Sequence, residues 1–229
     1  MQHYTCALFD VDGTIIDTET CHAIANQEVI NRYGNGKEYT WDIRRQVMGN
    51  PAKFSNKILI DNYDISLTPE EMIPVKKEII EKLLVNVKLL PGIKQIMFYL
   101  KEKGFKIAAA TATQHELFEK KMKNFPEIRN LFDVVVCGDN PNVPRGKPFP
   151  DVFIYAAQLL GETDMSKTII FEDSPNGALA GYASGGLTFI STSPELKDEP
   201  AFKNIKYVFN SWTEFQPNLI GRTDVINYE

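Results

Sequence analysis

YTCALFDVDG, residues 4–13, begins with an apolar run, Tyr4 to Phe9, and ends in a turn that carries Asp10 and Asp12. Similar runs of four to six residues follow along the chain, at residues 105–110, 134–137, 168–171 and 187–190. Nearly continuous apolar character over so few residues is typical of strands that are buried on both faces of a parallel sheet. We therefore expect these segments to form such a sheet.

Helical patterns separate the expected strands. The first places apolar side chains along one helix face: Ile93, Ile96, Met97 and Leu100. Gly104 is placed to end that helix, and Gly161 ends a second one over residues 153–160. Strands that alternate with helices predict an α/β fold, a doubly wound parallel sheet with a Rossmann-like core and right-handed crossovers.

This alternation is interrupted between residues 18 and 88, where helical patterns follow one another without a convincing strand. One of these helices has a clear start, because Thr68 suits an N-cap, Pro69 the first helical position and Glu71 a capping box. The sequence thus predicts two domains. Residues 1–17 and 89–229 form the Rossmann-like core, and residues 18–88 form an inserted, all-helical cap domain.

Composition limits the partners and the compartment. The 229 residues include 25 basic and 30 acidic side chains, and a net charge of −5 does not suit binding to nucleic acid or an anionic membrane. The sequence shows no secretory signal, and no apolar run approaches the roughly 18 residues of a membrane span. The widely spaced Cys6, Cys21 and Cys137 indicate thiols in a reducing compartment. We expect a cytoplasmic, monomeric, globular protein.

Polar residues collect where the expected strands end. In chain order they are Asp10, Asp12, Thr111, Lys147, Glu172 and Asp173. In an open parallel sheet, ligands bind in the crevice beyond the carboxyl ends of the strands. These side chains, although far apart in sequence, are therefore expected to converge on one site.

The content of that site indicates phosphoryl chemistry. Neighbouring carboxylates repel one another unless a cation lies among them, and a cation held by a few carboxylates and several waters is typically Mg²⁺. A lysine and a hydroxyl would then bind the remaining oxygens of a phosphoryl group. Phosphoryl transfer needs mainly positioning and neutralisation of negative charge, which this set supplies.

Each motif taken alone also has other interpretations. A pair of aspartates spaced like Asp10 and Asp12 occurs in calcium loops and glycosyltransferases, but glycine stands fourth here and not sixth, which excludes a calcium loop. Lys147 is followed by Pro148, which excludes a P-loop. Considered alone, Lys147 is typical of a lysine on a solvated surface. Thr111 alone is typical of a residue at a strand end whose hydroxyl hydrogen-bonds to its own backbone. The acidic pair at 172–173 suits a complement to the dipole of the following helix.

Taken together, four segments resemble the motifs of the haloacid dehalogenase-like hydrolase superfamily: residues 9–14, Thr111, residues 146–148 and residues 171–174. A helical insertion after the first motif is similar to the small cap of the beta-phosphoglucomutase-like branch. Within that branch the chain looks most like the pseudouridine-5′-phosphatase group. This likeness extends to residues 31–33, 41–42, 47–49 and 138–141 and to the tail at 215–217 and 228–229.

The resemblance implies a role for each site residue. Asp10 would be the nucleophile that forms an aspartyl-phosphate, and Asp12 the general acid and base. Mg²⁺ would be held by the Asp10 carboxylate, the Asp12 backbone carbonyl and Asp173, with Glu172 acting through water or as a further ligand. The phosphoryl oxygens would be bound by Thr111, Lys147 and backbone N–H groups including that of Ala112.

The cap holds two further candidates. His22 lies ten residues after Asp12, where the mutase branch carries a substrate-binding histidine. The mutase arginine expected after Gly49 is not evident, and Ala52 and Lys53 stand there instead. His22 and Lys53 are the candidate substrate contacts from the cap.

We expect a Mg²⁺-dependent phosphatase of a small phosphorylated metabolite, with pseudouridine 5′-phosphate as the leading substrate. The alternatives are a sugar-phosphate phosphatase, a hexose-phosphate mutase similar to beta-phosphoglucomutase, and, more remotely, a non-catalytic binding protein on the same fold. A mutase conserves organic phosphate, whereas a phosphatase releases it.

Overall fold

The computed structural model describes residues 3–48 and 52–228. The chain divides into two compact units. The core unit comprises Met1–Ile16 and Leu89–Glu229, and the helical unit comprises Asp17–Lys88. Within the described ranges, no helix has both the length and the apolar character that crossing a membrane requires.

The core unit is built on one sheet, in which six parallel strands lie within the described residues. They are β1 (Cys6–Phe9), β2 (Lys106–Ala110), β3 (Val134–Val136), β4 (Thr168–Glu172), β5 (Leu187–Ser191) and β6 (Tyr207–Phe209). Their order across the sheet is β3-β2-β1-β4-β5-β6, so β1 is central. The apolar runs predicted the first five strands to within two residues. The sixth was missed because its apolar run has only three residues between Lys206 and Asn210, whereas the equally short β3 belongs to a four-residue run that continues into Cys137.

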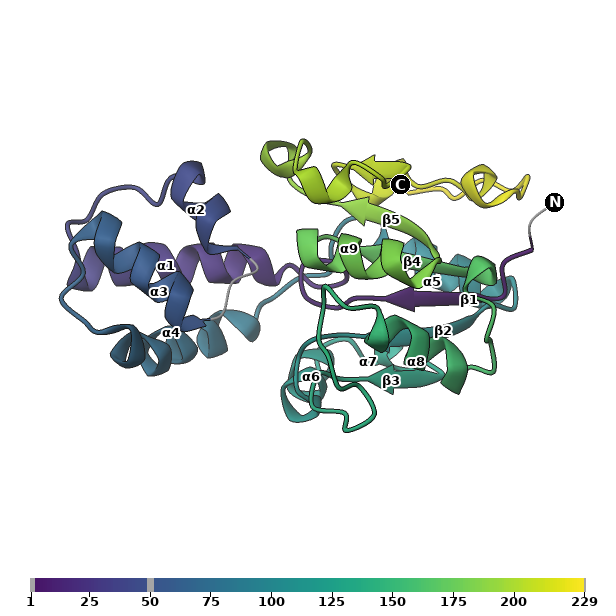
Figure 1. Ribbon diagram of the computed structural model, residues 1–229, viewed down its shortest axis with the longest axis horizontal. Coiled ribbons are helices and arrows are strands. Elements are labelled where there is room, and N and C mark those ends of the chain that lie inside the picture. Colours follow the sequence, from purple (N-terminus) through teal and green to yellow (C-terminus); the bar gives the residue numbers. More distant parts are fainter. Residues whose placement is uncertain (1–2, 49–51, 229) are drawn as a thin grey trace. The chain divides into compact units, whose positions relative to one another are not determined.

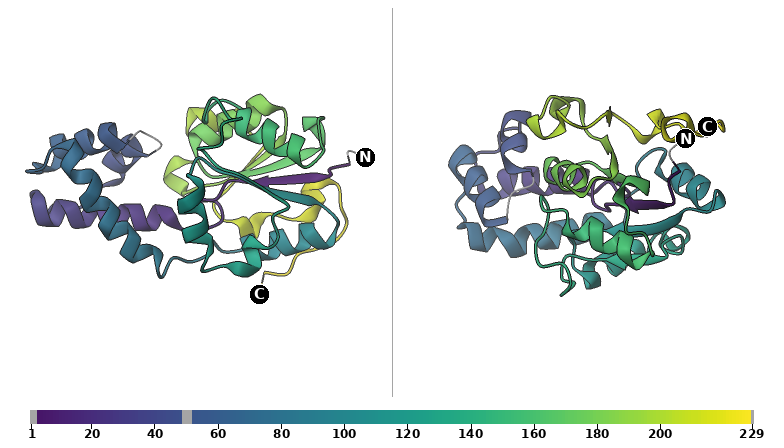
Figure 2. Two further views of the ribbon diagram at one scale, coloured as in Figure 1. Left: turned by 90° about the horizontal axis from the view of Figure 1, so that it is seen from below. Right: turned by 45° about the vertical axis from the view of Figure 1, so that its right-hand side comes forward.

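Helices cover both faces of this sheet (Figures 1 and 2), which confirms the doubly wound α/β prediction. The core-unit helices are α5 (Ile93–Glu102), α6 (His115–Met122), α7 (Pro126–Arg129), α8 (Asp151–Leu159) and α9 (Pro175–Ser184). Short 3₁₀ turns join the later elements: η1 (Met165–Lys167), η2 (Pro194–Leu196), η3 (Pro200–Phe202), η4 (Trp212–Glu214) and η5 (Pro217–Ile220). In the left view of Figure 2, α8 and α9 lie on one face and α5 on the other.

The strand side chains alternate between two different packing layers. On the face covered by α8 and α9, small and branched residues such as Leu8, Ala108 and Ile170 form a buried aliphatic cluster. The opposite face is aromatic: Phe9 stacks on Phe171 with ring centroids 4.4 Å apart, and Trp212 and Phe215 pack edge-on against Phe171. Each such buried ring contributes about 1.5–3 kcal/mol by leaving water.

The register of β1 aligns the strand ends that carry polar residues. Phe9 lies opposite Ala109 of β2 and Phe171 of β4. The next residue along β1, Asp10, is therefore level with Glu172, and the backbone N–H of Asp10 continues the ladder by donating to Phe171 O at 3.0 Å. Residues that follow these strands consequently meet beyond the carboxyl ends of the strands.

The helical unit contains α1 (Thr18–Tyr33), α2 (Trp41–Val47), α3 (Ala52–Tyr63) and α4 (Pro69–Leu84). These helices share a hydrophobic core that includes Val29, Leu59 and Met72. The predicted capping box at the start of α4 is present. The backbone N–H of Thr68 donates to Glu71 Oε2 at 2.8 Å, and that of Glu71 donates to Thr68 Oγ1 at 3.2 Å.

Candidate active site

The turn after β1 is shaped by close packing against the loop after β4. Gly13 has a φ of +79°, and a Cβ at this position would lie 2.2 Å from Asp173 Oδ2, so only glycine fits. Thr14 Oγ1 donates to Asp173 Oδ1 at 3.0 Å, and Trp212 Nε1 donates to Thr14 O at 2.8 Å. The turn is thereby tied both to an acidic residue and to the C-terminal segment.

Three carboxylates converge at the ends of β1 and β4. One oxygen from each of Asp10, Glu172 and Asp173 lies within 4.8 Å of the other two. Asp10 is 6% exposed and Glu172 is fully buried. Glu172 Oε2 accepts the backbone N–H groups of Asp173 (2.8 Å) and Ser174 (3.0 Å), so this oxygen holds the start of α9 in place.

Glycine is also required beside Glu172. A Cβ on Gly177, in the first turn of α9, would lie 1.8 Å from the Glu172 carboxyl carbon. The predicted N-cap is present there, because Ser174 Oγ accepts the backbone N–H of Gly177 at 3.0 Å. The Glu172 carboxylate is therefore fixed against a helix N-terminus.

Lys147 is the positive charge of this cluster. Its Nζ lies 2.6 Å from both Asp10 Oδ1 and Glu172 Oε1, and its side chain is 8% exposed. Burial alone would lower the pKa of Lys147, but the negative charges of Asp10 and Glu172 outweigh it and hold the pKa above its usual value. The lysine is therefore charged and shared between the two buried carboxylates.

Asp10 is in a strongly perturbed environment. Burial raises its pKa to about 7, the charge of Lys147 opposes this shift, and the charges of Glu172 and Asp12 add to it. One lysine thus does not compensate for the burial of these carboxyl groups. A further cation beside Asp10 would favour its ionised form.

The donor set fits a hard divalent cation. All the donors are oxygens, as Mg²⁺ prefers, and they lie within 4.8 Å of one another. Both oxygens of Glu172 already accept hydrogen bonds, from Lys147 and from the start of α9. Asp10 and Asp173 are consequently the better placed direct ligands.

Thr111 lies just after β2, next to a pair of backbone donors. The residue is 1% exposed, its backbone N–H donates to Val136 O at 3.0 Å, and its Oγ1 accepts the backbone N–H of Thr113 at 3.1 Å. The Thr111 O–H itself is left to donate. No hydrogen bond within residues 3–48 and 52–228 uses the backbone N–H of Val11 or Ala112. These groups are suited to binding an oxyanion.

Asp12 has two partners that the sequence patterns did not reveal. Its Oδ1 accepts from Lys121 Nζ at 2.6 Å, and its Oδ2 accepts from Thr113 Oγ1 at 2.5 Å. Lys121 occurs in a charged stretch of α6 that resembles a solvated surface. Its position was nevertheless informative, because it lies on the helix face of Phe118 and Met122, which are both buried.

The two candidates from the inserted segment lie in the helical unit. His22 is in α1 and Lys53 in α3, and both residues are exposed. Lys53 Nζ is 3.0 Å from Glu70 Oε1. Gly49, from which the mutase arginine was sought, and the terminal Glu229 lie outside the described residues.

The fold and the cluster define an α/β enzyme whose buried carboxylates and lysine meet at the strand ends. Residues 7–190 match the family model for haloacid dehalogenase-like hydrolases, and the chain belongs to that family. This confirms the resemblance carried by the four motifs.

Relatives named as phosphatases match nearly the whole chain. A probable pseudouridine-5′-phosphatase of Drosophila melanogaster is 30% identical over 223 residues, covering 96% of this chain and 95% of that protein. The mitochondrial (DL)-glycerol-3-phosphatase 1 of Arabidopsis thaliana is 30% identical over 222 residues, covering 95% of this chain and 73% of that protein.

A solved structure with the same fold contains bound phosphate. CbbY from Rhodobacter sphaeroides, in complex with phosphate, has a TM-score of 0.72 and 26% identity, covering 92% of this chain and 96% of that chain. The family and its phosphatase members make this protein a phosphoric monoester hydrolase.

Proposed function

We propose that the protein is a Mg²⁺-dependent phosphatase that hydrolyses a small phosphorylated metabolite through an aspartyl-phosphate on Asp10. The observation that carries this proposal is the position of Asp10. Its carboxylate is buried, contacts Lys147 at 2.6 Å and lies beside Asp173 at the carboxyl edge of the sheet. A carboxylate removed from bulk water, with a cation on one side and an oxygen-donor site on the other, is suited to attack a phosphoryl group.

The Mg²⁺ ligands would be the carboxylates of Asp10 and Asp173 and the backbone carbonyl of Asp12, with Glu172 acting through water or as a further ligand. When bound there, the metal would offset the negative charge of the phosphoryl oxygens. Gly13 supports this arrangement, because its lack of a Cβ allows Asp173 to approach the turn that carries Asp10 and Asp12.

The reaction would proceed in two steps. In the first, an Asp10 oxygen bonds to phosphorus, the bond from phosphorus to the leaving oxygen breaks, and Asp12 supplies the proton that this oxygen needs. In the second, Asp12 takes a proton from water as that water attacks the phosphorus of the aspartyl-phosphate. The Asp10–phosphorus bond breaks, inorganic phosphate leaves, and Asp10 is regenerated.

The remaining site residues would bind the phosphoryl oxygens. Lys147 is anchored by two carboxylates, so it supplies a fixed positive charge next to the reacting centre. The Thr111 hydroxyl and the backbone N–H groups of Val11 and Ala112 supply neutral donors at the same edge of the sheet. Donors that are already in position stabilise a transition state without reorganising during the reaction.

Thr111→Ala is expected to reduce phosphate release by about 10²-fold, because it removes one donor to the transition state. The measurement is kcat with saturating substrate and Mg²⁺, and Thr111→Ser, which keeps the hydroxyl, is the matched variant. A loss below about threefold in Thr111→Ala would mean that the hydroxyl serves only as the acceptor for the Thr113 N–H.

We further propose that the helical unit determines which substrate is accepted, since the core residues described above would contact only the phosphoryl group, its leaving oxygen and the metal. His22 and Lys53 are its candidate contacts to the leaving group. The likeness to a probable pseudouridine-5′-phosphatase over 96% of the chain supports pseudouridine 5′-phosphate as the substrate. The likeness to a glycerol-3-phosphatase supports a polyol phosphate as the second candidate. We place the enzyme in the cytoplasm as a monomer.

Phosphate release from a panel of substrates tests this function. With Mg²⁺ present, we expect the highest kcat/KM for pseudouridine 5′-phosphate and lower values for uridine 5′-phosphate, glycerol 3-phosphate and sugar phosphates. Chelation of Mg²⁺ with EDTA is expected to abolish release, and added Mg²⁺ to restore it. The product formed from beta-glucose 1-phosphate is followed in parallel.

The outcomes separate the alternatives. Release from glycerol 3-phosphate or sugar phosphates alone would retain the mechanism and replace the substrate. Isomerisation of beta-glucose 1-phosphate without release would show a mutase. Activity that persists in EDTA would contradict the metal site.

A further inference from the structure

The Asp12 carboxylate is held at both of its oxygens by side chains from a separate segment of the core unit. Lys121 Nζ donates to Oδ1 at 2.6 Å, and Thr113 Oγ1 donates to Oδ2 at 2.5 Å. The two donors also lie close to one another, with Lys121 Nζ 3.4 Å from Thr113 Oγ1. Bonds to both oxygens hold the carboxylate more firmly than a bond to one oxygen could.

We propose that Lys121 and Thr113 are positioning residues that orient the Asp12 carboxyl group for its proton transfers. This inference rests on the proposed function, in which Asp12 acts as general acid and base. Neither Lys121 nor Thr113 belongs to the cluster around Asp10, where Lys147 already provides the positive charge. The two aspartates of the turn thus have separate lysine partners.

Packing does not require a lysine at position 121. The side chain is 7% exposed and lies on the buried face of α6, between Phe118 and Met122. An apolar residue would complete this face without the cost of removing a charge from water, and replacing buried ion pairs with apolar residues is often neutral or stabilising. The buried ammonium group is therefore best explained by what it does for Asp12.

The chemistry of the two donors differs in a useful way. Lysine only donates, so Lys121 anchors Oδ1 and leaves Oδ2 as the oxygen that exchanges a proton. A hydroxyl both donates and accepts, so Thr113 can stay bonded to Oδ2 whether or not this oxygen carries a proton. The Asp12 side chain is 27% exposed, which leaves it accessible to a substrate and to water.

The test uses leaving groups that differ in their need for a proton. An alkyl phosphate ester requires protonation of its leaving oxygen, whereas p-nitrophenyl phosphate releases a stable phenolate. For Lys121→Met we expect kcat to fall by about 10²-fold on the best alkyl substrate of the panel, because a misplaced catalytic group costs about this much. KM is expected to stay within about threefold. On p-nitrophenyl phosphate the loss in kcat/KM, which reports the first step alone, is expected to be below about threefold, whereas kcat can also fall because Asp12 is the general base of the second step for every substrate.

Further variants complete the experiment. Thr113→Val is expected to show the same dependence on the leaving group, and Thr113→Ser to recover activity relative to Thr113→Val. Lys120→Met is the matched control, because Lys120 is the adjacent lysine of α6, is 64% exposed and pairs with Glu116 at 3.0 Å. It is expected to match wild type on both substrates. Asp12→Asn supplies the reference pattern, with a loss on the alkyl ester of roughly 10²–10⁴-fold.

Each contrary result has a distinct meaning. Equal losses in kcat/KM on both substrates in Lys121→Met and Thr113→Val, or no loss in kcat/KM on the alkyl ester, would overturn the positioning role while Asp12→Asn keeps its selective loss in kcat/KM. A wild-type protein that releases phosphate from no substrate would overturn the proposed function and the positioning role with it.

Discussion

Asp10→Asn is expected to lower phosphate release by at least about 10⁴-fold, the largest effect of any single substitution in this protein. An amide has the shape of the carboxylate but is not a nucleophile, so no aspartyl-phosphate can form. The measurement is kcat at saturating Mg²⁺, together with the mass of the protein after brief exposure to substrate. Wild type is expected to show a fraction heavier by one phosphoryl group, and the variant none.

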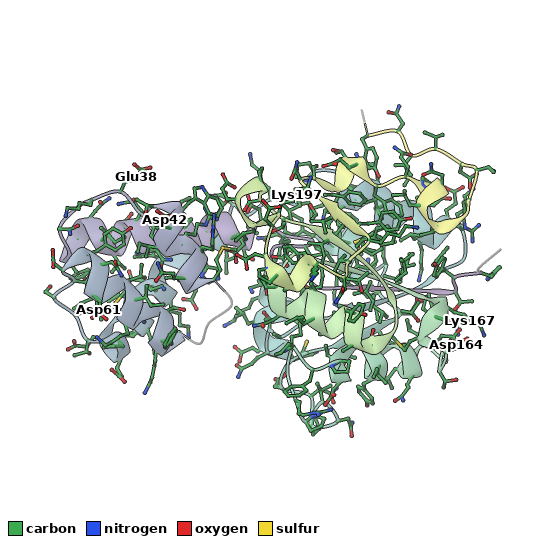
Figure 3. All side chains as sticks on the ribbon, turned by 45° about the horizontal axis from the view of Figure 1, so that its top comes forward. Glu38, Asp42, Asp61, Asp164, Lys167 and Lys197 are labelled. Carbon is green, nitrogen blue, oxygen red and sulfur yellow. The ribbon has the colours of Figure 1, made fainter. Side chains whose placement is uncertain are left out.

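A matched control separates loss of the nucleophile from a general effect of losing one carboxylate. Asp61→Asn makes the same chemical change on the exposed surface of the helical unit (Figure 3), where Asp61 pairs with Lys57. It is expected to retain wild-type activity. If Asp10→Asn releases phosphate at a rate close to that of wild type, the nucleophile is another group, and the mechanism proposed for this site is wrong.

Lys147→Met is expected to lower the free energy of unfolding by about 3–5 kcal/mol, in addition to impairing activity. The substitution removes the shared partner of Asp10 and Glu172, which are both buried, and leaves their carboxyl groups without the opposite charge. Urea denaturation measures the change. Lys57→Met, which removes a lysine from an exposed ion pair, is the control and is expected to cost less than about 1 kcal/mol.

The loss of unfolding free energy caused by Lys147→Met is expected to depend on pH. The pKa of Asp10 is already raised to about 7 in the native protein, and loss of the lysine charge raises it further. In the unfolded chain the pKa of an aspartate is about 4, so between these values the native state holds a proton that the unfolded state has released. In this range the stability of the native state falls as the pH rises. Because the range extends to higher pH in the variant than in wild type, the loss of unfolding free energy caused by Lys147→Met should be larger above pH 7 than at pH 5. A deficit that does not vary with pH would contradict this account.

Most of the core unit was predictable, because its strands are buried on both faces. Burial of that kind leaves a run of apolar residues, and the sudden change to polar residues marks the strand end. The same change marked Asp10, Thr111 and Glu172 as candidate site residues, since parallel strands bring their carboxyl ends together. Strand β6 was missed for the corresponding reason. Its apolar run of three residues lies between Lys206 and Asn210 and is shorter than any of the five runs that were recognised, including the four-residue run that contains the other edge strand, β3.

The partners of Asp12 could not be predicted in the same way. Lys121 is 109 residues away in sequence and contacts Asp12 only because α6 follows β2, the neighbour of β1 in the sheet. Its side chain has the character of a surface residue, and only its place between Phe118 and Met122 marks it as buried. A contact between two polar side chains that are far apart in sequence produces no recognisable pattern in a single sequence. Burial of apolar side chains, in contrast, produces a periodic pattern.

The order of the strands has a consequence for how the protein is made. β1 leaves the ribosome first, but its neighbours in the sheet, β2 and β4, begin only at Lys106 and Thr168. After β1 and before β2, the ribosome synthesises the helical unit. The helices of this unit pack mainly on one another and can fold while β1 is still unpaired. Asp10 is thus translated long before Lys147, its ion-pair partner. During most of synthesis, the nascent chain carries an apolar strand with both edges open, a segment of the kind that chaperones bind.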